Sequence, residues 1–223
     1  MPFKFHVVKK IPFMTNLGAH SGFLPHFPPS PLQKSRRLYG ARDTCYPANM
    51  ADDSWKTEFH HVYTRGVAAW RNGKRNPAQL WEDRDLEFLE TIGCTAQELF
   101  DFVEDHCLDG EPDEETALAV QEIRRDYFVN VQGSKKTIHC ARMQDLPAKS
   151  DAVDGIAWLP RLIVKARLKL RGEMPPDLMY GCGGDRPFLR RMNSSLPEFL
   201  RLVRDSGTDD RKIVDTLKRG AGL

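Results

Sequence analysis

Residues 155–189, GIAWLPRLIVKARLKLRGEMPPDLMYGCGGDRPFL, decide how this chain is expected to fold. Apolar side chains recur at helical spacing from residue 156 to residue 170, which predicts an amphipathic helix. Gly172 is a typical residue at the end of such a helix. A glycine-rich turn follows, and its final Asp185-Arg-Pro is typical of the start of another helix. The stretch therefore predicts two helices joined by a turn.

A degenerate repeat of this pattern lies 100 residues upstream. The matched positions are Asp85 with Asp185, Phe88-Leu89 with Phe188-Leu189, and the capping boxes at 95–98 and 195–198. A repeat of this length indicates duplicated domains, because solenoid repeats have periods of about 20–50 residues. We therefore predict an all-α protein with two tandem homologous helical units, a degenerate one at 45–127 and a clear one at 147–223. The matched aspartates are interpreted as helix caps.

The segment between the units, residues 128–146, is expected to be a linker with a short β-hairpin. Residues 128–131 and 137–140 favour strands, and Gly133-Ser134 between them favours a turn. Residues 1–44, before the first unit, are rich in proline and are interpreted as a disordered basic tail. That tail is also the expected result of a start codon assigned too early, because Met50 precedes the compact region. A polyanion-binding arm is the alternative for its basic residues.

Composition separates the tail from the rest of the chain. Residues 1–42 hold seven Lys/Arg and no Asp or Glu, which leaves 26 basic and 31 acidic residues in the remainder of the 223-residue chain. A body of that sign argues against nucleic-acid binding. No run of 18 apolar residues is present, so no membrane span is expected. The five cysteines show no C-x₂-C spacing, which favours free thiols in the cytoplasm over a disulfide framework.

The familiar motifs for metals and cofactors are missing from the sequence. The His-Cys pairs at 106–107 and 139–140 do not have the ligand spacing of a zinc site. The Gly181-Cys-Gly-Gly turn is too short for a dinucleotide fingerprint, and the chain has neither a Walker A sequence nor a Gly-x-Ser-x-Gly elbow. We therefore expect neither a metal nor a cofactor.

The candidate site lies in the second unit, because Arg161, Tyr180 and Cys182 occur only there. Lys165 is matched by another cation, Arg65, in the first unit. The predicted ligand-binding residues are Arg161, Lys165, Tyr180, Cys182, Asp185 and Arg186. Arg161, Lys165 and Lys169 form a basic stripe on the first helix, and such a stripe is most often solvated. Three interpretations of the turn stay open: a packed core in which Cys182 is a small buried residue, an anion-binding pocket, and a nucleophilic site that uses Cys182.

The same stretch resembles a bacterial family of unknown function whose members share a Leu-Pro-Arg…Lys…Gly…Tyr-x-Cys-x-x-Asp…Phe-Leu core. The pattern falls here on Leu159-Pro160-Arg161, Lys165, Arg167, Gly172, Tyr180, Cys182, Asp185 and Phe188-Leu189. The resemblance covers residues 147–219 well and residues 47–124 only weakly. Many relatives have Pro-Leu where this chain has Gly183-Gly184, so it does not support a mechanism that needs those glycines. The resemblance implies a fold unit and no activity.

These observations favour a non-enzymatic binding module in the cytoplasm. Its expected ligand is a small anion or an acidic protein partner, held near Arg161, Lys165 and Cys182. A cysteine-dependent enzyme that uses Cys182 is the first alternative. A purely structural interaction protein, in which the turn is only core, is the second.

Overall fold

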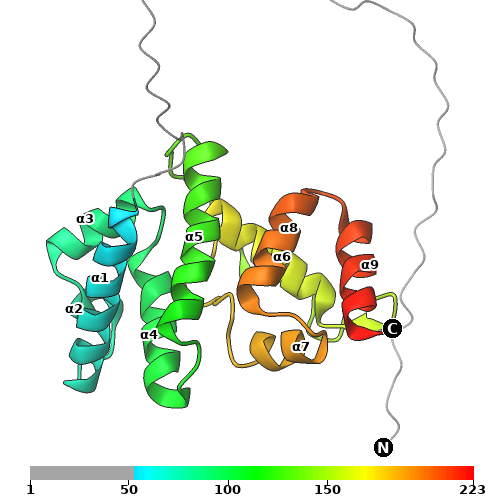
Figure 1. Cartoon of the computed structure of the whole chain (residues 1–223), viewed down its shortest axis with the longest axis horizontal. Coiled ribbons are helices and arrows are strands. Elements are labelled where there is room, and N and C mark those ends of the chain that lie inside the picture. Colours follow the sequence, from blue (N-terminus) through cyan, green and yellow to red (C-terminus); the bar gives the residue numbers. More distant parts are fainter. Residues whose placement is uncertain (1–52) are drawn as a thin grey trace, which may run out of the picture. The chain divides into compact units, whose positions relative to one another are not determined.

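Nine α-helices dominate the computed structural model, which describes residues 53–223, and they confirm the all-α prediction (Figure 1). The first half contains α1 (Ser54–Arg71), α2 (Pro77–Leu80), α3 (Asp83–Thr91), α4 (Ala96–Asp109) and α5 (Glu114–Asn130). A 3-10 turn (Met143–Asp145) and the strands β1 (Ala152–Val153) and β2 (Ile156–Ala157) follow. The second half contains α6 (Leu159–Arg171), α7 (Asp185–Arg191), α8 (Leu196–Ser206) and α9 (Asp210–Ala221). The expected tail, residues 1–44, and Met50 lie outside the described residues.

One hydrophobic core runs through both halves of the described chain. Each long helix contributes a stripe of apolar residues at helical spacing, as Phe59, Val62 and Tyr63 do for α1. Leu159, Leu162 and their neighbours do the same for α6. Helix α5 packs against α1 on one side and against α6 and α8 on the other, and Figure 1 shows it between the two groups of helices. The helices of both halves therefore stabilise one another.

The order and the packing of the helices each repeat only in part, and α2 has no helical counterpart in the second half. Helices α1 and α4 contact each other as α6 and α8 do. The Nε1–H of Trp81 donates to the carbonyl of Ala96 (3.1 Å), and the hydroxyl of Tyr180 donates to that of Leu196 (2.8 Å), 100 residues further on. In contrast, α5 packs mainly against α1, α6 and α8, whereas α9 packs against α8. The common origin of the two units stays a prediction.

The two matched phenylalanines differ in burial. Phe188 is buried, whereas Phe88 is only half-buried at the edge of the core. The leucines that follow them, Leu89 and Leu189, are both buried. The Phe-Leu match at an offset of 100 residues therefore corresponds to one equivalent core position and one unequal position.

The β-hairpin lies in a different place from the one expected. Residues 128–130 belong to α5, and residues 137–140 form no regular structure. Phe128 is buried against Gly93, where an added Cβ would lie 2.6 Å from the ring, so burial on a helix outweighs its strand propensity. The observed strands pair antiparallel around Asp154-Gly155, and both turn residues have positive φ (48° and 78°). Asp-Gly is the typical two-residue hairpin turn, and it is a stronger signal than the Gly133-Ser134 turn expected from the sequence.

The basic stripe of α6 was expected to be solvated, but two of its residues, Lys165 and Lys169, are buried. Lys165 and Lys169 are each 2% exposed, and their ammonium groups form ion pairs with Asp185 and with Glu98, the latter at 2.9 Å. Long lysine side chains can pack their stems in apolar surroundings if the charged end finds a partner. Here both partners come from outside α6: Asp185 begins α7, and Glu98 lies in the first turn of α4.

The matched aspartates are buried ion-pair partners, and neither is the expected N-cap residue of its helix. Asp185 is the first residue of α7, whose N-cap is Gly184, and its carboxylate pairs with Lys165. Asp85 completes a capping box with Glu82 and also accepts a 2.5 Å ion pair from Arg65. In both halves a cation on the first helix therefore meets the buried carboxylate 20 residues later.

Several predicted helix ends are correct. The hydroxyls of Thr95 and Ser195 both accept a hydrogen bond from the backbone N–H three residues later, which confirms the two capping boxes. Gly172 ends α6 in the left-handed conformation (φ 67°). Helix α6 itself starts only at residue 159, because residues 156–157 pair as a strand and Trp158 has a positive φ.

We expect Asp185→Asn to destabilise the protein more than Asp85→Asn. The fully buried Asp185 accepts bonds from Lys165, from the backbone N–H of Gly181 (2.9 Å) and from Trp158 (3.0 Å). Its neutralisation leaves the Lys165 ammonium buried without a counter-charge, which costs about 3–5 kcal/mol.

The loss is smaller for Asp85, because the side chain of Arg65 is 31% exposed and also binds Glu58. Chemical denaturation measures the free energy of unfolding of both variants. Equal losses would contradict the central role given to Asp185.

Candidate functional site

The turn at Cys182 brings together half of the predicted site residues. The Lys165 ammonium lies 3.4 Å from the sulfur of Cys182 and forms its ion pair with Asp185 at the same time. Asp185 is fixed in turn by the backbone N–H of Gly181 and by the indole of Trp158. The positive charge at this turn is therefore already balanced by a buried carboxylate.

The other predicted residues have separate roles. Arg161 donates to the carbonyl of Pro147 (2.7 Å), so its guanidinium binds the chain segment before β1. Tyr180 is buried with its hydroxyl bonded to Leu196, and burial raises its pKa well above the ordinary range. Arg186 donates to Asp105 (2.6 Å) and to the carbonyl of Gly181 (2.8 Å). The predicted set does not form one pocket, and the ligand-binding role of each member stays a prediction.

The glycines of the turn have packing roles. Gly181 has a φ of 91°, which favours glycine, and an added Cβ would lie 2.8 Å from Leu196. At Gly184 a Cβ would lie 2.7 Å from the ring of Trp158. At Gly183 a Cβ would make only an ordinary van der Waals contact, 3.8 Å from Nη2 of Arg186. The turn thus lets Trp158 lie on the backbone at Gly184, which agrees with a packed core.

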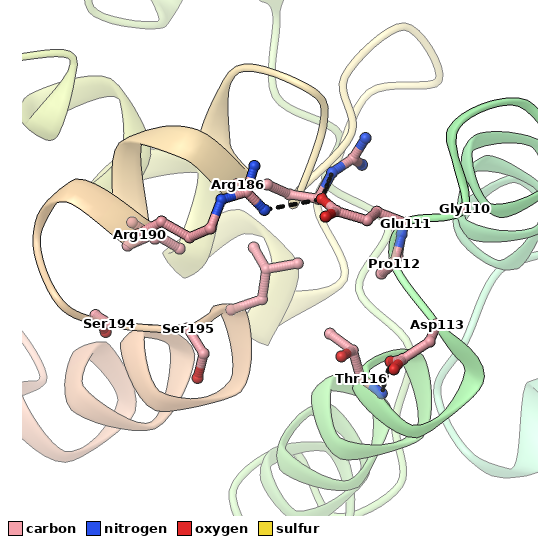
Figure 2. A pocket seen from close by; sticks show the side chains of 11 residues that line it. Gly110, Glu111, Pro112, Asp113, Thr116, Arg186, Arg190, Ser194 and Ser195 are labelled. Atoms are coloured by element: carbon pink, nitrogen blue, oxygen red, sulfur yellow. Dashed lines mark hydrogen bonds and ion pairs between the residues drawn. The ribbon is translucent and has the colours of Figure 1, made fainter.

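A cleft of about 250 Å³ lies between the α4–α5 loop, α7 and the start of α8 (Figure 2). Arg186 and Arg190 reach this cleft, and both bind Glu111, at 3.4 and 2.8 Å. Asp113 is the N-cap of α5 and accepts the backbone N–H of Thr116 (2.9 Å). Because each cation here already has an acidic partner, the cleft offers no free charge to a ligand.

A second cleft, of about 300 Å³, lies where the two halves meet. The end of α3 and the start of α4 form one wall, and Arg124 of α5, the end of α6 and residues 136–137 complete it. The lining residues are Leu86, Leu89, Glu90, Gly93, Cys94, Thr95, Ala96, Arg124, Lys136, Thr137 and Gly172.

Arg124 is the unusual residue of this second cleft. It is 2% exposed, and its Nη1 donates to the side chain of Gln132 (2.8 Å) while the guanidinium lies 5.2 Å from the ring centre of Phe128. Its Nε has no hydrogen-bond partner, and no carboxylate of the described residues forms an ion pair with it. Burial lowers the pKa of Arg124, and Glu98 opposes this effect only from a distance.

The neighbouring acid is already paired. Lys169 donates to Glu98 at 2.9 Å, and the same carboxylate accepts the backbone N–H of Thr95 at 3.0 Å. Burial alone would raise the pKa of Glu98, but Lys169 and Thr95 together hold it below the usual value. The positive charge of Arg124 therefore lacks a dedicated partner in the part of the chain that the structure describes.

Sequence reasoning missed Arg124. The pair Arg124-Arg125 reads as the basic end of a helix, a common and unremarked feature that suits the helix dipole. Helix α5 continues to residue 130, so Arg124 lies inside it and faces the interior. No linear signal marks the residue, because it differs from the other buried cations of the described chain only in having no ion-pair partner in three dimensions.

The described residues contain few other candidates for chemistry. They hold no group of three or more His, Cys, Asp or Glu side chains that could bind a metal ion. Their cysteines, at positions 94, 107, 140 and 182, are free. Burial raises the pKa of Cys94 to about 12, so this thiol of the second cleft stays protonated. Between residues 53 and 223, no helix is long and apolar enough to cross a membrane.

Comparisons with protein-family models, with curated proteins and with solved structures find no match for this chain. The resemblance to a bacterial family of unknown function therefore stays a prediction.

The packing role of the turn glycines predicts different effects for two neighbouring substitutions. Gly184→Ala should lower the thermal midpoint by several degrees, because its Cβ collides with the ring of Trp158 and disturbs the bond from that ring to Asp185. Gly183→Ala, the matched control, adds only an ordinary van der Waals contact with Arg186 and should change little. If both variants melt like the wild type, Trp158 does not hold the turn as described.

Proposed function

We propose that this protein is a non-enzymatic binding module for a small anionic ligand, with its site in the cleft at Arg124 instead of the turn at Cys182. The supporting observation is the buried guanidinium of Arg124, for which no described residue supplies a carboxylate partner. An unpaired buried charge costs free energy. Residues that cost stability in this way are typical of functional sites, where a ligand supplies the missing contact.

The turn at Cys182 supports anion binding less well. An anion there would compete with Asp185 for Lys165, and Arg161 already binds a backbone carbonyl. The start of α7 offers no free positive charge either, because Lys165 and Asp185 neutralise each other there. Anion binding therefore remains the proposed function, with its site at Arg124 and not at Cys182. A cytoplasmic location and an acidic protein as the alternative ligand belong to the same proposal.

Arg124→Met tests the site, with Arg125→Met as its matched control. Both changes remove one positive charge from α5, but Arg125 lies over the ring of Trp55 (5.0 Å) and does not line the cleft. Without a ligand, Arg124→Met should unfold with a free energy equal to or above that of the wild type, because an unpaired buried charge is gone.

Thermal melting in sodium acetate, benzoate, phosphate or sulfate, each against sodium chloride at equal ionic strength, gives the second readout. At least one of these anions should raise the midpoint of the wild type and of Arg125→Met by a few degrees. The shift should be lost in Arg124→Met. A strongly destabilised Arg124→Met together with no anion effect in the wild type would make Arg124 a structural residue and end the proposal.

The cysteine-dependent enzyme stays the alternative, favoured by the 3.4 Å contact between Lys165 and Cys182. Our proposal expects Cys182 to behave as an ordinary half-buried thiol. In the native protein, iodoacetamide should then modify the exposed Cys140 faster than Cys182, as followed by peptide mass spectrometry. Faster modification of Cys182 at neutral pH would favour the enzyme.

A further inference from the structure

The cleft at Arg124 contains one positive charge in excess. Lys136 and Glu90, which both line it, form an ion pair at 2.5 Å near the surface. Glu98, beside the cleft, is bound by Lys169. The charges within each of these pairs neutralise each other, so the cleft has a net charge of +1, which belongs to Arg124. A ligand with a single negative charge fits this count.

Residues 1–52 contain few acidic side chains that can pair with Arg124. Residues 1–52 contain only two acidic residues, Asp43 and Asp52, because residues 1–42 hold none. The internal source of a counter-charge for Arg124 is therefore limited to these two side chains, and each can be removed by a single substitution.

The walls of the cleft are mainly apolar around the charge. Leu86, Leu89 and Ala96 line it, and Leu86 is 37% exposed, which is high for a leucine in a folded helix. Gly93 and Gly172 add two positions without side chains. A cavity of about 300 Å³ is at the small end of the range for ligand pockets. Its size and lining suit a compact ligand with an apolar body.

The start of α4 adds polar groups that favour an anion. Thr95 and Ala96 line the cleft, and the capping box satisfies the backbone N–H groups of Thr95 and Glu98. The N–H groups of Ala96 and Gln97 have no partner within the helix, as at any helix start. The positive end of the α4 dipole therefore faces the same space as Arg124.

From these observations we infer that the ligand of the cleft is a monocarboxylate with a small apolar body. The inference rests on the function proposed above and names its ligand class. A planar carboxylate matches the fork of a guanidinium and neutralises one charge. A phosphate dianion brings a second negative charge, and Lys136, the other cation of the described cleft, is already paired with Glu90.

Three probes with the same phenyl ring separate the effect of the ligand's charge from that of its apolar body. They are benzoate, the neutral benzamide, and phenylphosphonate, which is a dianion under mildly alkaline conditions. Isothermal titration calorimetry or ligand-observed NMR on the full-length protein measures their affinities. Benzoate should bind with a dissociation constant at least about tenfold below those of the other two. Its binding should be lost in Arg124→Met and kept in Arg125→Met.

Gly172 provides a second test that does not change the charge. A Cβ at Gly172 would lie 2.6 Å from Nη2 of Arg124, so Gly172→Ala should displace the guanidinium and weaken benzoate binding. Gly110→Ala is the matched control, because Gly110 also ends a helix at positive φ (78°) and has nothing within 4 Å of an added Cβ. Equal benzoate affinities in the two variants would contradict a carboxylate at Arg124.

The outcomes separate the ligand class from the function. If phenylphosphonate binds more tightly than benzoate and still requires Arg124, the carboxylate is wrong and the anion-binding function stands. If benzamide binds as well as benzoate, or if no probe binds, both are wrong. Benzoate affinity should be unchanged in Asp43→Asn and Asp52→Asn. A rise in either variant would identify an internal partner of Arg124 and overturn the inference.

Discussion

The ion pair between Lys165 and Asp185 holds the second half of this protein together. Asp185 is fully buried and binds α6 through Lys165, the glycine turn through Gly181, and the hairpin end through Trp158. One carboxylate thus fixes three segments that are separate in the sequence. Its charge is tolerated in the interior because each hydrogen bond is made with good partners. Arg65 and Asp85 form a more exposed version in the first half.

Matched charges also join the two halves. Lys169 of α6 meets Glu98 of α4, and Arg186 of α7 meets Asp105 of α4. Against this background of paired buried cations, Arg124 stands out. Proteins tend to break their own packing rules at functional sites. The unpaired Arg124 therefore makes the cleft between the halves a better candidate site than the turn at Cys182.

The sequence pattern behind the family resemblance falls largely on residues that build the fold. Lys165 and Asp185 form the buried ion pair, Tyr180 holds the start of α8, and Gly172 ends α6. Such residues mark a helical unit without defining a reaction. Their structural roles agree with the prediction that this pattern marks a fold and no activity.

The sequence by itself determined the helices and several of their ends. Apolar periodicity, capping boxes and Gly172 are local signals, because a helix closes its hydrogen bonds within a few residues. Local signals failed at Phe128, where burial overrode strand propensity, and at Lys165, whose partner lies 20 residues away. Only the tertiary structure could decide the charge balance of the interior. Whether Arg124 has a counter-charge depends on which side chains folding brings near it, and no spacing along the chain records that.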